Sequence, residues 1–312
     1  MIEVQNVTYS YTGSGQPALS DVSFRVNDGE ICGFLAPNGG GKTTLFKLLA
    51  TLLPVQKGRL LYDGEEYRNN FAAIRSTIGV VFQSPSVDTK LTVRENLNCQ
   101  AYLYGSTPRK LGRIIDETIQ LFDLEKYLHK NLETLSGGYR RRVELAKCML
   151  HNPRTILLDE PGNGLDIVSR HDLWKHLTYL RDKKNVTILV TTHLIEEAEQ
   201  CDRVIVMDEG KLVVTGTPAV LKDEIGGEVL SLKTRDVPSL LSLLKQKWGI
   251  EGVSVNGTVR IEVKNNRKIV STLLTEHLEL IDSATLSKPS LADVFFRHTG
   301  NKFDGENAGR MS

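Results

Sequence analysis

The chain has 312 residues and nearly balanced charge, with 39 Lys and Arg against 38 Asp and Glu. Its hydrophobic share of 40% and charged share of 25% are typical of a soluble globular protein, and the length suits two structural units. The charge balance argues against a general nucleic-acid binder, and no apolar run approaches the roughly 18 residues that a membrane helix needs.

The N-terminus and the cysteines indicate in which cellular compartment the protein is expected. The opening MIEVQNVTYS contains neither a basic leader nor an apolar signal core, so we expect a cytosolic protein. The four cysteines are widely separated, which indicates neither a zinc pair nor a disulfide framework. They are Cys32, Cys99, Cys148 and Cys201.

The N-terminal third is predicted to be rich in strands. Short or alternating apolar runs predict strands at 2–7, 22–26, 31–35, 60–62 and 78–82. The first two are expected to be antiparallel, joined through the turn at 13–15. Asp63-Gly64 after the fourth strand indicates a hairpin. Leucines at helical spacing over 45–49 predict a helix directly after a glycine-rich turn.

From about residue 84 to 152 the pattern becomes helical. Thr92 and Glu95 form a predicted capping box, Pro108 suits the first turn of a second helix, and Ser136 is expected to cap a third. Strands then return at 155–158, 186–191, 203–207 and 212–215. A helix over 167–181 separates the first two of these strands, which predicts a β-α-β unit and a parallel sheet.

A second unit is predicted from residue 227 to 300. Its expected strands are 229–232, 253–255, 259–263 and 278–284, and its expected helices are 237–248 and 268–277. The order β-α-β-β-α-β indicates a small α+β domain of the ferredoxin-like type. Asn256-Gly257 is a strong hairpin signal between the second and third strands. The polar end, residues 301–312, is predicted to be disordered.

The stretch from Ala36 to Thr44, APNGGGKTT, predicts a phosphate-binding loop. Glycines let backbone N–H groups converge on an anion, and a helix beginning near Gly41 aims its free N–H groups at the same point. Lys42 would add a positive charge for the β- and γ-phosphates, and Thr43 a hydroxyl for Mg²⁺. A surface glycine turn is the alternative. The candidate nucleotide-binding residues of the loop are Asn38, Gly39, Gly40, Gly41, Lys42, Thr43 and Thr44.

The buried strand Ile156–Leu158 runs directly into Asp159 and Glu160. Carboxylates at such a place are costly unless a cation meets them, and Mg²⁺ would be that partner for Asp159. Glu160 could then orient or deprotonate the attacking water. Read alone, the run could also be a strand that ends in a solvated acidic turn.

A third anion-binding element is predicted at LSGGY, residues 135–139. Ser136 would cap a helix whose first turn contains Gly137 and Gly138. Glycine destabilises a helix by roughly 1 kcal/mol relative to alanine, so the pair makes sense if the bare backbone must approach a ligand. This run resembles the signature motif of ATP-binding cassette (ABC) ATPases. The resemblance implies a head-to-tail homodimer in which Ser136, Gly137 and Gly138 contact the γ-phosphate of ATP held by the other subunit.

Other positions match the ABC family in the same order. The resemblance implies that Tyr11 stacks on adenine and that Gln83 touches Mg²⁺ and the lytic water. It implies that Asp166 lies in the loop that crosses the dimer, and that His193 contacts the γ-phosphate. Taken alone, each has a common structural alternative. The implied catalytic residues are Glu160, His193 and Gln83, and the implied Mg²⁺ ligands, partly through water, are Thr43, Gln83 and Asp159.

Two stretches resemble the drug- and antibiotic-exporting ATPases of the daunorubicin-resistance type: 135–153, and 288–296 followed by Thr299-Gly300. That resemblance implies an α/β P-loop cassette over 1–222 with a mixed sheet core, an antiparallel β subdomain and a helical subdomain at about 84–152. The region 227–300 would be an accessory domain. The chain would hydrolyse ATP and power a separate polytopic membrane permease subunit, on the cytoplasmic face of the membrane. The cargo would be drugs, antibiotics or lipophilic compounds.

The sequence departs from the family pattern at Ala36 for glycine, Tyr139 for glutamine and Gly162 for threonine. We expect Ala36 to be accommodated if its φ is negative. A soluble ABC ATPase of DNA repair or of ribosomes is the alternative function. The first would need an inserted coiled coil and the second resembles two cassettes in one chain. We expect the three arginines at 140–142 to be solvated or ion-paired rather than bound to nucleic acid, because three consecutive residues fan around a helix.

Overall fold

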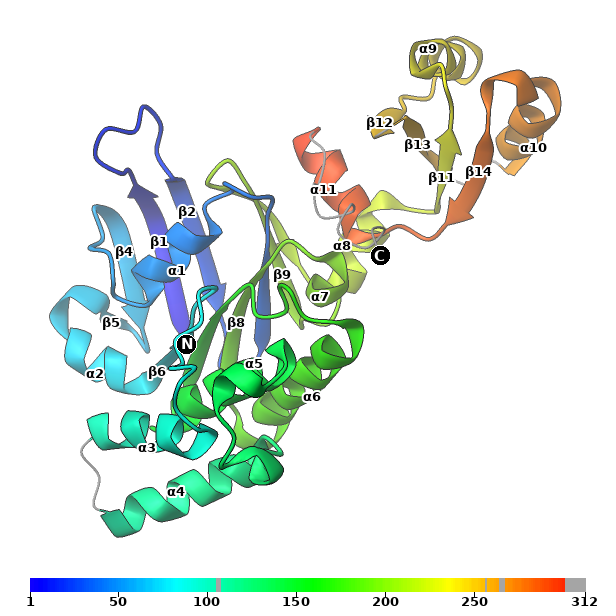
Figure 1. Cartoon of the computed structure of the whole chain (residues 1–312). Helices are drawn as coiled ribbons and strands as arrows, with labels where there is room; N and C mark the ends of the chain where they lie inside the picture. The colour runs from blue at the N-terminus through cyan, green and yellow to red at the C-terminus, as the bar shows by residue number, and fades with distance from the viewer. Residues whose placement is uncertain (105–107, 256, 264–266, 301–312) are drawn as a thin grey trace. The chain divides into compact units, whose positions relative to one another are not determined.

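The computed structural model describes residues 1–104, 108–255, 257–263 and 267–300 (Figure 1). Contacts divide the chain into two compact units, Met1–Leu212 and Val213–Ser312. The expected disordered tail at 301–312 and Asn256 of the expected hairpin lie outside the described residues. Within the described ranges, no helix is both long enough and apolar enough to span a bilayer.

The first unit begins with an antiparallel sheet in the order β2-β1-β4-β5. Its strands are β1 (Ile2–Tyr9), β2 (Leu19–Val26), β4 (Lys57–Tyr62) and β5 (Glu65–Glu66). The predicted hairpin is confirmed: Asp63 and Gly64 join β4 to β5 with φ of 51° and 82°. Positive φ at both central residues matches the twist of the strands in a two-residue turn.

A six-stranded sheet in the order β10-β9-β3-β8-β7-β6 runs through the centre of this unit, and most of β10 lies past its last residue, Leu212. Its strands are β3 (Ile31–Leu35), β6 (Ile78–Val81), β7 (Thr155–Asp159), β8 (Thr187–Thr192), β9 (Arg203–Asp208) and β10 (Lys211–Gly216). The five strands from β9 to β6 pair in parallel. Every residue of β3, β7 and β8 is buried, as expected for parallel strands covered on both faces. The carboxyl ends of these three strands therefore meet at one edge.

Helices of the first unit follow the predicted caps. They are α1 (Lys42–Leu49), α2 (Phe71–Thr77), α3 (Val93–Leu103), α4 (Pro108–Leu121), α5 (Gly137–Met149), α6 (Ile167–Lys184) and α7 (Ile195–Ala198). The capping box of Thr92 and Glu95 is present at α3, and Ser136 caps α5. The sequence reasoning did not predict α2, although Asn70 caps it through the backbone N–H of Ala73.

The core of the first unit joins its two sheets through α1, which Figure 1 shows beside β1 and β2. The buried cluster contains Val4 of β1, Phe34 of β3, and Leu45, Phe46 and Leu49 of α1. Phe34 meets Phe46 edge-on, with ring centroids 5.6 Å apart. Because α1 is packed from both sides, the loop at its N-terminus is held in place.

From β11 to β14 the second unit has the predicted order of elements, flanked by two helices that were not predicted, and its sheet β12-β13-β11-β14 is antiparallel. Its elements are α8 (Pro218–Ile225), β11 (Glu228–Lys233), α9 (Val237–Trp248), β12 (Val253–Val255), β13 (Thr258–Val263), α10 (Arg267–Glu276), β14 (Ser283–Ser287) and α11 (Leu291–Thr299). One core cluster contains Leu230 and Leu232 of β11, Leu240 and Leu244 of α9, and Ile261 of β13.

The predicted last strand is present, but its predicted bounds, 278–284, are wrong. A 3₁₀ turn occupies Leu278–Leu280, and β14 begins only at Ser283. The apolar signal came from residues such as Ile281, which is buried in the core without lying in the sheet. The strand itself is an edge strand with a mostly exposed, polar pattern, so alternation gave no signal for it.

Candidate functional site

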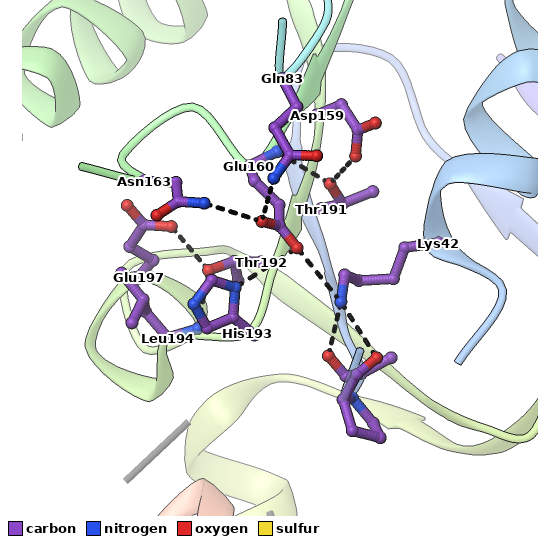
Figure 2. Close-up of polar contacts among 12 residues, drawn as sticks. Lys42, Gln83, Asp159, Glu160, Asn163, Thr191, Thr192, His193, Leu194 and Glu197 are labelled. Atoms are coloured by element: carbon purple, nitrogen blue, oxygen red, sulfur yellow. Dashed lines mark hydrogen bonds and ion pairs between the residues drawn. The ribbon is translucent and has the colours of Figure 1, made fainter. Parts of the chain in front are cut away.

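Three loops meet at the carboxyl edge of the central sheet, and Figure 2 shows the polar contacts between them. The phosphate loop follows β3, Glu160 follows β7, and His193 follows β8. In open parallel sheets, this edge is where ligands bind. The sheet order therefore brings together three motifs, although the phosphate loop lies more than a hundred residues before Glu160 and His193 in the chain.

The phosphate loop has the backbone that its glycines predict. Gly39 and Gly41 have φ of 82° and 93°, and α1 begins at Lys42. A Cβ on Gly41 would lie 2.8 Å from the Ala18 carbonyl oxygen. Ala36 does not have positive φ, which confirms the condition under which its methyl group fits. The loop thus has the turn and helix start that a phosphate needs.

Lys42 is buried within this loop, with 5% of its surface exposed. Its Nζ donates to the carbonyl oxygens of Ala36 at 2.8 Å and Pro37 at 3.1 Å, and lies 3.3 Å from Glu160 Oε1. Burial lowers the pKa of Lys42, while the charge of Glu160 acts in the opposite direction. The ammonium group is therefore held at the loop with a partner charge already in place.

Glu160 lies at the centre of the site. Its Oε1 is 3.3 Å from His193 Nδ1, and its Oε2 accepts hydrogen bonds from Gln83 Nε2 at 3.2 Å and Asn163 Nδ2 at 3.3 Å. Contact with His193 holds the pKa of this carboxyl group below its usual value, with Lys42 acting in the same direction and burial opposing both. All of the predicted catalytic side chains, Glu160, His193 and Gln83, thus come together.

The backbone of Glu160 has positive φ, at 48°, which is uncommon for a residue with a side chain. Its N–H donates to Thr191 on β8, to the hydroxyl at 2.9 Å and to the carbonyl at 3.1 Å. Backbone strain of this kind occurs at functional sites, where neighbours fix the conformation. Asn163 was missed by sequence reasoning; its only signal was its place in the turn after Glu160.

Asp159 is buried beside Glu160 and accepts a 2.5 Å hydrogen bond from the Thr191 hydroxyl. Gln83 donates its amide N–H to Glu160, which leaves its amide oxygen as an acceptor. Together with the exposed Thr43 hydroxyl, these groups are oxygen donors, and Mg²⁺ prefers one or two carboxylates with water and phosphate oxygens. The donor set therefore fits Mg²⁺.

Tyr11 follows β1 and is 41% exposed. Its hydroxyl lies 3.2 Å from the Thr44 hydroxyl of α1, and its ring packs edge-on against Tyr9 with centroids 5.1 Å apart. The aromatic ring is thus attached to the helix that carries the phosphate loop. Its predicted stacking on adenine stays a prediction.

The signature residues lie on α5, apart from the hydrogen-bond network of Glu160. Ser136 is exposed, and its hydroxyl accepts the backbone N–H of Tyr139 at 3.5 Å. A Cβ on Gly138 would lie 2.4 Å from Ser169 Oγ, so α5 and α6 approach too closely for a side chain there. The Ser169 backbone N–H and hydroxyl donate to the predicted dimer-loop residue Asp166, at 2.8 and 2.7 Å.

The three arginines after the signature are engaged within the chain. Arg141 pairs with Glu144 at 2.8 Å and Arg142 with Asp172 at 2.6 Å. Arg140 donates to the carbonyl oxygens of Leu132 and Glu133. These contacts confirm the ion-paired interpretation for Arg141 and Arg142. Stacked beneath Arg142 is the Tyr139 ring, with the guanidinium carbon 4.9 Å from its centroid.

Comparison with known proteins gives the same class. The family model described as ABC transporter matches residues 19–163. The chain is 33% identical over 290 residues to a Nod factor export ATP-binding protein I of Rhizobium sp. (strain N33), covering 92% of this chain and 93% of that protein. It is 31% identical to the daunorubicin resistance ATP-binding protein DrrA3 of Streptomyces coeruleorubidus, covering 91% and 92%.

Two solved structures support the fold. The chain is similar to cbiO1 of Clostridium perfringens, part of the transporter complex cbiONQ, with a TM-score of 0.67 and 26% identity over 80% of this chain and 95% of that one. It is also similar to the cassette MJ0796, solved as a dimer in a post-hydrolysis state with ADP and Pi. There the TM-score is 0.63 and the identity 25%, over 70% of this chain and 98% of that one.

Fold and site together define a P-loop ATPase that converts ATP to ADP and phosphate. More specifically, the chain belongs to the ABC transporter family, as an ATP-binding subunit. The relatives just described match nearly its whole length and are named as transport or resistance ATP-binding proteins. The transporter function is therefore favoured over the DNA-repair or ribosomal alternative.

Proposed function

We propose that two copies of the chain bind two ATP molecules head to tail and drive a separate membrane permease that exports lipophilic compounds. The contact network of Glu160 carries this proposal, because it joins the residues expected to bind phosphate, water and the γ-phosphate. In the proposed complex, the loop amides and Lys42 bind the β- and γ-phosphates, and Tyr11 stacks on adenine.

Glu160 is proposed as the base that accepts a proton from the attacking water. Its lowered pKa keeps the carboxyl group ionised at neutral pH, which a base requires. Gln83 and Asn163 hold the same oxygen and would orient the water, while His193 would contact the γ-phosphate. Mg²⁺, when bound through Thr43, Gln83 and Asp159, would neutralise charge on the β- and γ-phosphates.

The dimer contact is proposed at the exposed signature helix and the loop of Asp166. Ser136, Gly137 and Gly138 would contact the γ-phosphate of the second copy. Directly after Asp166, Ile167 and Val168 leave 82% and 71% of their surface exposed. Adjacent apolar side chains in this position favour burial against another surface.

A permease is the proposed partner of the helical region at about 84–152. At the end of α3, Tyr102 and Leu103 are 66% and 79% exposed. This region also follows Gln83, so a movement there could be transmitted to the site. The chain would then lie on the cytoplasmic face of the membrane through its partner. The names of its relatives, Nod factor export and daunorubicin resistance, support export of lipophilic compounds, drugs or antibiotics.

For the domains we propose a cassette over 1–222 and an accessory domain over 227–300. The β-α-β-β-α-β order and the sheet β12-β13-β11-β14 support a ferredoxin-like fold for the accessory domain.

The test measures sedimentation of Glu160→Gln with and without MgATP. We expect ATP binding at near wild-type affinity, loss of hydrolysis and an ATP-dependent shift from monomer to dimer. Adding Ser136→Ala should abolish the shift. Co-purification from membranes with a polytopic subunit tests the transporter role. A Glu160→Gln variant that hydrolyses ATP at the wild-type rate, or stays monomeric with ATP, contradicts the proposal.

A further inference from the structure

Another buried acid, besides Asp159 and Glu160, lies next to the loop that carries His193. Glu197 belongs to the short helix α7, and only 1% of its surface is exposed. Its Oε2 accepts a 2.6 Å hydrogen bond from the Thr192 hydroxyl, which in turn accepts the Leu194 backbone N–H at 2.9 Å (Figure 2). The two residues on either side of His193 are thus connected to one carboxyl group.

The other oxygen of this carboxyl group faces the loop after Glu160. Among the described residues it has no regular hydrogen-bond partner, and a Cβ built on Gly162 would lie only 1.8 Å from it. Glu197 therefore occupies space that any residue other than glycine would need at position 162. Gly162 does not have positive φ, so alanine there would add a methyl group without backbone strain.

Glu197 also faces the loop of Asp166. Arg170 Nε lies 3.9 Å from Glu197 Oε1, beyond hydrogen-bond distance but close enough for charge attraction in a buried place. The same guanidinium donates from Nη2 to the Leu165 carbonyl oxygen at 3.3 Å. Leu165 directly precedes Asp166 in the chain.

Such an arrangement is unfavourable for stability alone. A buried carboxyl group with an unsatisfied oxygen costs free energy that an apolar side chain in the same space would avoid. Burial raises the pKa of Glu197, while the hydrogen bond from Thr192 and the charge of Arg170 act in the opposite direction. The position of the acid between two loops of the site gives it a role that stability does not explain.

We propose that Glu197 is a positioning residue for ATP hydrolysis, holding the His193 loop against the loop that follows Glu160. This inference rests on the roles proposed above for Glu160 and His193. Glu197 touches neither side chain through a described hydrogen bond; it acts through Thr192 on one side and through the backbone at Gly162 on the other.

The test is a double-mutant cycle on the full chain. Gly162→Ala should push the carboxyl group off the Thr192 hydroxyl and lower kcat about tenfold, with KM for ATP changed less than about twofold. Glu197→Ala should lower kcat by a similar factor. The double variant should be no slower than Glu197→Ala, because the added methyl group then has room. Glu197→Gln keeps the shape and the acceptor for Thr192, so it should retain most of the rate.

Two matched controls separate positioning from general damage. Glu196→Ala removes an exposed neighbouring acid, and Gly112→Ala adds a methyl group that meets nothing within 4 Å. Both should keep kcat. Additive losses in the double variant, a loss of ATP affinity equal to the loss of kcat, or an unchanged rate in Gly162→Ala would each overturn the inference. If Glu197→Ala does not fold, Gly162→Ala and Glu197→Gln still decide it. Failure of Glu160→Gln to block hydrolysis would instead contradict the proposed function.

Discussion

In the first unit, two of the buried acids lie just beyond strand ends: Glu160 directly follows β7, and Glu197 lies on the short helix α7 after β8. Among the described residues, one oxygen of Glu197 has no regular hydrogen-bond partner. In the second unit, the buried acid Asp293 is fully engaged. It pairs with Arg260 at 2.9 Å and forms a capping box with Ser290 at the start of α11. The contrast suggests two uses of buried acids. Asp293, whose partners satisfy both of its oxygens, stabilises its unit, whereas Glu160 and Glu197 contact residues from separate loops and are available for chemistry.

The largest effect on function is expected from replacing Lys42, the buried charge of the first unit that we propose to bind phosphate. Lys42→Ala should lower ATP affinity at least about a hundredfold, because the variant loses the charge-assisted contact to phosphate that we propose for this buried side chain. Equilibrium titration with a fluorescent ATP analogue measures this. Lys47→Ala, on the last turn of the same helix, is the control and should bind normally. Equal binding by both variants would contradict the site.

Asn163 sharpens the comparison because it lies in the site but not in any predicted motif. Its side chain bonds the Glu160 oxygen that also accepts from Gln83. Asn163→Ala should lower kcat about tenfold through loss of orientation, with ATP affinity unchanged. Steady-state kinetics with a separate binding titration measures both. An unchanged kcat would show that Gln83, His193 and Lys42 hold the acid without Asn163.

Asp293 tests the other part of the comparison, the stabilising role of the buried acid in the second unit. Asp293→Ala removes a buried ion pair and a helix cap, so the second unit should lose about 3 kcal/mol of stability. The ATPase rate at low temperature should not change. Urea unfolding followed by Trp248 fluorescence measures the loss. In the exposed pair of Asp282 with Arg235, Asp282→Ala should cost less than about 1 kcal/mol. A similar loss in both variants would contradict the comparison.

The smallest effect is expected in the dependence of stability on acidic pH. The pKa of Glu160 is held below its usual value of 4.5 by His193 and Lys42, so the unfolded chain binds more protons than the native chain as pH falls past that value. This contribution to stability is present above about 4.5 and is lost as pH falls through the native pKa. Urea unfolding at a series of pH values should therefore show a shallower acid slope for Glu160→Gln. Identical slopes would exclude the shift.

Much of the first unit could be predicted because its motifs are local. Each of these motifs predicts a local conformation from a few neighbouring residues. They are the three glycines before Lys42, the capping serine before Gly137 and the two acids after an apolar run. The contacts of Asn163 and Glu197 could not be predicted, because they depend on which loops the strand order β3-β8-β7 brings side by side. Family resemblance supplied the grouping that the residues alone left open.

The second unit shows the reverse balance. Its order of strands and helices followed from apolar periodicity, but the last strand did not, since Ile281 is buried by a turn rather than by the sheet. The helix α11 was also missed, although Ser290 and Asp293 before an apolar run are a helix-start signal. Apolar periodicity indicates that a residue is buried, but it does not show whether that residue lies in a strand, a helix or a turn.

The left-handed backbone of Glu160 bears on how this protein could be made more heat-resistant. A side chain at this φ costs about 1 kcal/mol, which glycine would avoid. Glu160→Gly would, however, leave the buried Lys42 without its partner charge, and that loss costs more than the relaxed backbone gains. A directed-evolution campaign that screens only for survival at high temperature should therefore keep the acid at this codon.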